Sequence, residues 1–198
     1  DQLDMETGAN VTRLQDRVNL SRYARPDSDL VALMVLEHQT KLHNLLTRAN
    51  WETRIALHQQ EDMNRALGQP STYWFDSTRR RIHSHVEDLL KYLLFTEEVR
   101  LKAAVAGTAG FQDEFPKAGP RDRRGRSLRD LDLKTRLFRY PCSFLIYSDA
   151  FTALPPAARD HLYRRLHDVL TGKEQSQEFA SLSRDDRTAI LEILLDTK

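Results

Sequence analysis

Hydrophobic side chains recur at the spacing of an α-helix along the first long segment of the chain. Asp27, Ser28 and Asp29 are N-cap candidates for the start of this helix. A stripe then follows at intervals of three and four residues, formed by Val31, Met34, Val35, His38, Leu42, Leu45, Ala49, Glu52 and Ala56. No glycine or proline interrupts it before Gly68. The pattern predicts one long helix that begins near residue 28 and ends at Gly68.

A second apolar stripe follows after a short turn. Gly68, Pro70 and Ser71 supply a helix stop, a turn and a new N-cap. The second stripe consists of Ile82, Val86, Leu89, Leu90, Leu93, Leu94, Leu101 and Val105. Because so short a connection places consecutive helices side by side, residues 28–106 are predicted to form an antiparallel helical hairpin.

The rest of the chain predicts a loop and several short helices. Residues 107–130 have no periodicity and are rich in glycine, proline and arginine, which predicts a long loop. Residues 131–198 are predicted to be helical, although the aromatic and β-branched residues 137–147 are ambiguous; we favour a short buried helix after Pro141. Pro156 opens a helix that closes at Gly172, and Ser183 and Asp186 have capping-box spacing before the last helix.

These elements predict an all-α fold, in which a long antiparallel helical hairpin is braced by three or four shorter helices. Residues 28–198 are expected to form this single domain. Residues 1–27 are polar and end in Arg25-Pro26, which predicts an extended N-terminal arm. The chain starts at Asp1 without an initiator methionine, so we expect that residues before it have been removed.

Composition narrows the classes of function. The 30 basic and 29 acidic side chains nearly cancel, leaving a formal charge of +1, so no nucleic-acid partner is expected. The longest apolar run, residues 30–36, is far shorter than the roughly 20 residues that span a bilayer. Cys142 is the sole cysteine, which excludes an internal disulfide and a covalent CxxCH haem site in this chain.

His38 is the leading candidate for chemistry, because it lies within the apolar stripe of the first helix. It can be a core histidine satisfied by a hydrogen bond, or a haem or transition-metal ligand with Met34 one helical turn before it. His43 is a weaker second ligand, since five residues turn a helix by about 140°. In an antiparallel hairpin, Glu97 or Glu98 of the second helix could meet His38 and complete a metal site.

Two further candidates lie outside the predicted hairpin. The loop side chains of Arg121, Arg123, Arg124 and Arg126 can bind a partner's phosphate or carboxylate groups, or pair with acidic groups of the domain itself, such as Glu114, Asp130 and Asp132. Cys142 has aromatic neighbours that indicate inert packing. A nucleophilic role would require a lowered thiol pKa, for example at a helix start.

Several segments of the chain resemble a family of uncharacterised exported bacterial proteins. The resemblance is carried by residues 28–40 with His43 and Asn44, by residues 125–133 continuing to 139–148, and by residues 186–194. It implies an all-helical domain and brings no assigned catalytic residues. It also suggests a periplasmic or otherwise exported location beside c-type cytochrome modules, where haem would come from another segment or partner.

Three hypotheses follow for the function. The first is a non-catalytic helical docking or structural module of a larger exported, redox-associated assembly, contacting a protein partner or upstream domain through its N-terminal arm and Arg-rich loop. The alternative is a metal- or haem-binding electron-transfer domain that uses His38 with Glu97 or Glu98. A thiol enzyme at Cys142 is the third and weakest interpretation.

Overall fold

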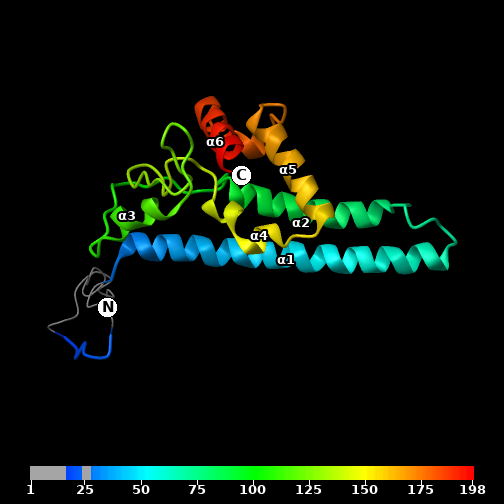
Figure 1. The fold of residues 1–198 in the computed structure, drawn as a ribbon, viewed down its shortest axis with the longest axis horizontal. Helices are drawn as coiled ribbons and strands as arrows, with labels where there is room; N and C mark the ends of the chain where they lie inside the picture. Colours follow the sequence, from blue (N-terminus) through cyan, green and yellow to red (C-terminus); the bar gives the residue numbers. More distant parts are fainter. Residues whose placement is uncertain (1–16, 24–27) are drawn as a thin grey trace, which may run out of the picture.

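The computed structural model describes residues 17–23 and 28–198, and these form an all-α fold. Helix α1, Leu30–Ala66, runs along the whole length of the molecule, and α2, Asp76–Leu93, packs antiparallel against it (Figure 1). The predicted helical hairpin is therefore present. The predicted arm of residues 1–27 lies outside the described residues, except for residues 17–23, which form a turn.

Helix α1 begins and ends at the residues that the sequence marked. Asp29 is its N-cap, and the carboxylate Oδ1 accepts a hydrogen bond from the backbone N–H of Ala32 at 3.0 Å. At the other end Gly68 has a φ of 62°, which lets the N–H of Gln69 bond back to the carbonyl of Asn64 at 2.9 Å. This is a Schellman termination, for which glycine is the preferred residue.

The second helix is shorter than predicted. It ends at Leu93, whereas the apolar pattern extended it through Leu101 to Val105. Beyond the helix, the N–H of Leu101 bonds to the carbonyl of Thr135, and the N–H of Val105 bonds to the carbonyl of Leu133. These hydrophobic residues thus belong to a segment paired with a distant loop, and their helical spacing was misleading.

Short helical elements follow the hairpin. The segment predicted as the Arg-rich loop 107–130 contains two helical turns, α3 (Phe111–Glu114) and the 3-10 turn η1 (Phe115–Ala118). After Pro141 come the 3-10 turn η2 (Phe144–Tyr147) and α4 (Asp149–Thr152), close to the predicted short buried helix. Helix α5 (Pro156–Leu170), the turn η3 (Gln177–Phe179) and α6 (Arg184–Thr197) complete the chain.

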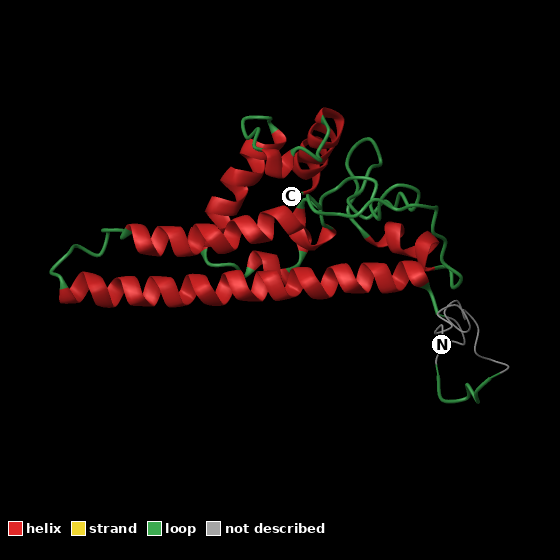
Figure 2. Ribbon diagram, turned by 180° about the vertical axis from the view of Figure 1, so that it is seen from behind, coloured by secondary structure: helices red, strands yellow, loops and turns green. Residues whose placement is uncertain are grey.

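The later segments stack on one side of the hairpin. Helix α5 packs on α2, and α6 packs on α5 (Figure 1). The loops between α2 and η2 gather near the N-terminal end of α1, where Figure 2 shows them in green. A single hydrophobic core joins the hairpin to these segments, with Leu42, Leu90, Phe138, Phe151 and Ile190 among its fully buried members. Within the described residues, no helix is long and apolar enough to span a membrane.

The capping box predicted at the start of α6 is present and offers a test of local stability. Ser183 Oγ accepts from the N–H of Asp186 at 3.0 Å, and the Asp186 carboxylate accepts from the N–H of Ser183 at 3.3 Å. We expect Ser183→Ala to lower the free energy of unfolding by about 1 kcal/mol. This corresponds to a fall of roughly 2–4 °C in Tm, measured by circular dichroism. Ser181→Ala, at an exposed serine two residues earlier, is the control and should leave Tm unchanged.

Candidate functional site

His38 lies on the inner face of α1, where it is only 4% exposed and is surrounded by aromatic rings. Its imidazole stacks on Phe95 with ring centroids 4.5 Å apart and on Tyr92 at 5.4 Å. The edge of Phe138 lies at 5.7 Å, and Phe144 lies beyond it at 6.4 Å. Burial lowers the pKa of His38 from 6.5 to about 4, so the ring is neutral at physiological pH.

A hydrogen bond joins His38 to the loop that follows Pro141. His38 Nε2 lies 2.7 Å from the hydroxyl oxygen of Ser143, a fully buried residue. The same hydroxyl accepts from the N–H of Leu145, and the N–H of Ser143 donates to the carbonyl of Leu93 at the end of α2. His38 therefore has the surroundings of a core histidine and connects α1, α2 and this loop.

His38 borders a groove of about 640 Å³ between α1 and the C-terminal end of α2. Met34, Leu45, Tyr92, Phe95 and Leu101 supply its apolar and aromatic lining. Charged side chains also line it, namely Glu37, Lys41, Arg48, Asp88, Lys91, Glu97 and Glu98. The sequence-predicted residues Met34, His38, Glu97 and Glu98 are thus brought to one groove.

Phe95 reaches this position through a strained backbone. Its φ is 54°, in the left-handed region that bulky residues rarely adopt. The strained residue completes a Schellman termination of α2, because the N–H of Thr96 bonds to the carbonyl of Lys91. A conformation of this kind costs on the order of 1–3 kcal/mol and persists where surrounding contacts impose it. Here the stacking of Phe95 on His38 is one such contact.

The four residues predicted as metal ligands, His38, His43, Glu97 and Glu98, are not gathered into one cluster. Within the described ranges, no three histidine, cysteine, aspartate or glutamate side chains approach closely enough to hold a metal ion. His43 is exposed on another side of α1. The carboxylate of Glu98 accepts a hydrogen bond from the N–H of Leu137 at 2.8 Å, and burial raises its pKa. Glu97 is exposed at the edge of the groove.

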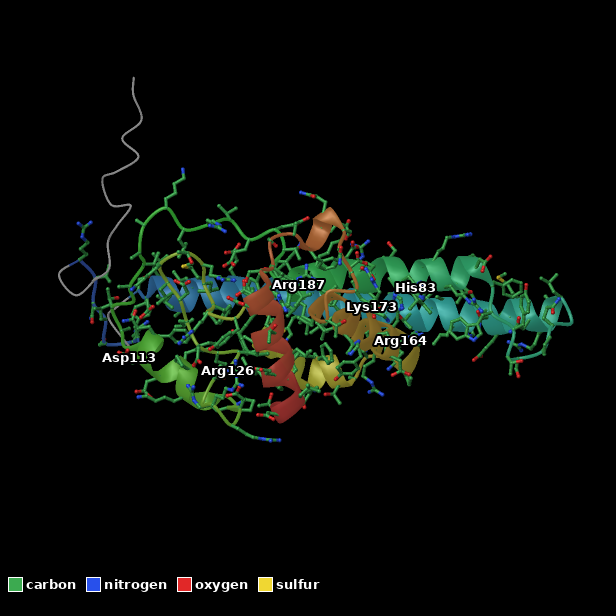
Figure 3. The ribbon with its side chains drawn as sticks, turned by 90° about the horizontal axis from the view of Figure 1, so that it is seen from above. His83, Asp113, Arg126, Arg164, Lys173 and Arg187 are labelled. Atoms are coloured by element: carbon green, nitrogen blue, oxygen red, sulfur yellow. The ribbon has the colours of Figure 1, made fainter. Side chains whose placement is uncertain are left out.

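The predicted partner-binding arginines pair with acidic groups of their own domain. Arg123 bonds to Asp196 of α6 at 3.2 Å, and Arg124 bonds to Glu192 of the same helix at 2.8 Å. Arg126 lies 2.7 Å from Glu192 and 2.7 Å from the buried carboxylate of Asp122. Figure 3 shows Arg126 beside α6. The loop is therefore fastened to the last helix of its own chain.

Arg121 lies 3.1 Å from Asp130 and also donates to the carbonyls of Pro116 and Gly125. Of the acidic partners suggested from the sequence, only Asp130 is used by these four arginines. Glu114 instead pairs with Lys117, and Asp132 accepts from the backbone of the turn that follows it. The side chains of Arg123 and Arg124 remain 89% and 68% exposed, so their use by a partner stays a prediction.

Cys142 is fully buried, and burial raises its pKa to about 12. A nucleophilic thiol requires the opposite change, so the interpretation as a thiol enzyme is not supported. We expect no detectable alkylation by iodoacetamide at neutral pH in the folded protein, and one alkyl group per chain after unfolding in urea, counted by mass spectrometry. Rapid alkylation of the folded chain would contradict the buried position.

Sequence reasoning found part of this site and missed the rest. The periodicity of α1 identified His38 as an inward-facing residue. Ser143 carried no signal, because its partner is 105 residues away along the chain. Phe95 looked like an ordinary apolar position of a longer helix. Comparisons with protein-family models, curated proteins and solved structures found no match to the chain.

Proposed function

We propose that the chain is a non-catalytic helical docking module that holds an amphipathic helix of a protein partner in the groove between α1 and α2. In keeping with the resemblance of the sequence, we place this module in an exported, redox-associated assembly. The observation that carries the proposal is the groove itself, which combines an aromatic lining, charged edges and a strained residue at one place.

The dimensions of the groove fit a helix. Of its residues on α1, Met34, His38, Lys41, Leu45 and Arg48 recur at intervals of four and three and so form one face, which Glu37 borders. They span about 21 Å at 1.5 Å per residue, the length of about four helical turns. A groove of half-buried apolar and aromatic groups between two helices is the usual receptor for the apolar face of a third helix.

Acidic and basic side chains lie at different positions along the groove. Glu37 of α1 and Glu97 after α2 lie toward the N-terminal end of α1, whereas Lys41 and Arg48 lie farther along that helix. Within the described part of the chain, none of these four side chains forms an ion pair. We therefore propose a partner helix with basic residues over Glu37 and Glu97 and acidic residues over Lys41 and Arg48.

Site-specific photocrosslinking tests the proposal. A photoreactive phenylalanine analogue replaces Tyr92, at the groove, in the cell that makes the protein, and a matched variant carries it at Tyr73, exposed near the hairpin tip. The groove position should crosslink one polypeptide through an amphipathic helix, mapped by mass spectrometry. A synthetic peptide of that helix should bind the purified protein, and Phe95→Ala should weaken its binding at least about tenfold.

Three results would contradict this proposal. They are the absence of a crosslink at Tyr92, a peptide that binds equally well to Phe95→Ala, and crosslinking that is equal at Tyr73 and Tyr92. Elemental analysis and an absorption spectrum of protein from its native source test the alternative. If the protein contained stoichiometric iron or zinc and His38→Ala removed it, metal or haem binding would replace docking as the proposed function.

A further inference from the structure

The side of α1 that faces away from the core has an exposed stripe with no charged members. It consists of Leu33, Leu36, Thr40, Asn44, Thr47 and Trp51, which we call the outer stripe. Leu33, Leu36 and Trp51 are 52%, 56% and 65% exposed. In Figures 1 and 2 no described helix covers the side of α1 opposite α2. Leu33 and Leu36 at one end of the stripe and Trp51 at the other thus leave apolar surface uncovered at both ends.

The C-terminal half of the same face of α1 differs from the outer stripe in composition. After Trp51, the outward-facing positions of α1 are Arg54, His58, Asp62 and Arg65. The carboxylate of Asp62 pairs with both His58 and Arg65. That charged pattern is normal for a solvated helix face. In the outer stripe, the hydroxyl of Thr40 donates to the carbonyl of Leu36 at 2.9 Å and is satisfied by its own helix. The stripe thus differs from the solvated half of α1 in composition.

The outer stripe is complementary to itself in an antiparallel arrangement. A two-fold axis level with residue 42 places Leu33 level with Trp51 of a second copy and Thr40 level with Asn44, and it brings Leu36 within one residue of the level of Thr47. Each of these pairs then occurs twice, as an isologous interface requires. The charges on one edge agree with this register, because Glu37 lies within one residue of the level of Arg48 of the second copy. In antiparallel helix pairs, residues on the same edge of the two helices face each other.

We propose that two copies of this chain associate through the outer stripe, with their α1 helices antiparallel and centred on residue 42. The interface goes beyond the proposed docking function and is centred on another face of α1, although its charged edge residues Glu37 and Arg48 also border the groove. The stripe extends about 27 Å at 1.5 Å per residue. One helix pair of this length buries less than the roughly 1,200 Å² of a standard interface, so the dimer is weak and its population depends on concentration.

Disulfide trapping tests the orientation of the helices. Leu36→Cys and Thr47→Cys variants of the full chain are mixed and oxidised, with buried Cys142 left in place. The antiparallel register brings the thiol introduced at position 36 of one copy to the thiol introduced at position 47 of the other. The mixed dimer should therefore form at least about tenfold faster than either variant crosslinks with itself. A self-linked Leu36→Cys dimer as the main product would indicate parallel helices and overturn the proposal.

Charge reversal tests the register without a crosslink. Sedimentation velocity over a range of concentrations should show a reversible dimer of the wild-type chain. Glu37→Arg should raise the dissociation constant about three- to tenfold, and Glu37→Arg combined with Arg48→Glu should restore it. Trp51→Glu should abolish the dimer, with circular dichroism confirming that each variant is folded. A wild-type chain that stays monomeric at every concentration would overturn the proposal and leave the groove untouched.

Discussion

Replacing Arg187 with methionine is expected to lower the free energy of unfolding by about 3 kcal/mol or more. The guanidinium of this α6 residue donates to four backbone carbonyls. The acceptors are Val169 at the end of α5, Glu174 at 3.2 Å, Phe179 at 2.7 Å and Leu182 at 3.3 Å. Figure 3 shows Arg187 at α6. Methionine keeps the apolar stem but leaves these partly buried acceptors without their charged donor.

Two variants isolate the cause of this loss. Arg187→Lys keeps the charge, but one ammonium group cannot reproduce a planar fork with donors in several directions, so it should recover only part of the stability. Arg184→Met removes an exposed arginine from the same helix and should change stability by less than about 0.5 kcal/mol. Urea unfolding followed by circular dichroism gives the three values. A loss below about 1 kcal/mol for Arg187→Met would contradict the structural role.

The helix boundaries that the sequence predicted correctly are those set by local chemistry. Asp29, Gly68, Pro156, Gly172 and the Ser183 capping box act within one turn of the chain, and each has the expected role in the structure. The end of α2 depends instead on a distant residue, because Phe95 turns away from the helix and stacks on His38. No local sequence pattern predicts that a helix ends at a phenylalanine with a positive φ.

The candidate site shows the same division. The inward position of His38 follows from the period of α1, but whether it binds a ligand or packs depends on what reaches it from elsewhere. Tyr92 and Phe95 at the end of α2, and Ser143 from the loop after Pro141, come from two other segments and surround the ring. Similarly, the arginines of the loop were visible in the sequence, whereas Glu192 and Asp196, their partners on α6, were not. Pairing between segments so far apart along the chain is a property of the fold.

Acidification is expected to destabilise the protein between pH 6.5 and about 4 through the buried His38 and the half-buried His161. Burial lowers the pKa of His38 from 6.5 to about 4. Burial, together with the neighbouring His83, lowers the pKa of His161 from 6.5 to about 4. Both rings bind a proton more readily in the unfolded chain. Their contribution to stability is therefore fully present above pH 6.5 and is lost as the pH falls toward 4.

The geometry explains why the folded protein resists protonation at both places. His38 is enclosed by aromatic rings. His161 stacks on His83 with ring centroids 3.7 Å apart and an interplanar angle of 5°, which joins α5 to α2. The nearby carboxylate of Glu87 is already engaged by Arg165, at 2.6 and 3.1 Å. A second positive charge in the stack would also meet Arg164, whose charge contributes to the lowered pKa of both stacked histidines.

Urea unfolding at pH 7, 6, 5 and 4 measures this loss. Moving one pKa from 6.5 to about 4 corresponds to about 3 kcal/mol for His38 and to less for the partly exposed His161. The total is comparable to the 5–15 kcal/mol that stabilises a typical domain, so the transition should move to much lower urea as the pH falls. In His161→Gln the slope of stability against pH should be shallower, since glutamine keeps polarity without titrating. His43→Gln, at an exposed position of α1, controls for the loss of an imidazole. If His161→Gln and the wild type lost equal stability between pH 6.5 and 4, the stacked histidines would not be part of the acid response, and His38 would have to account for it alone.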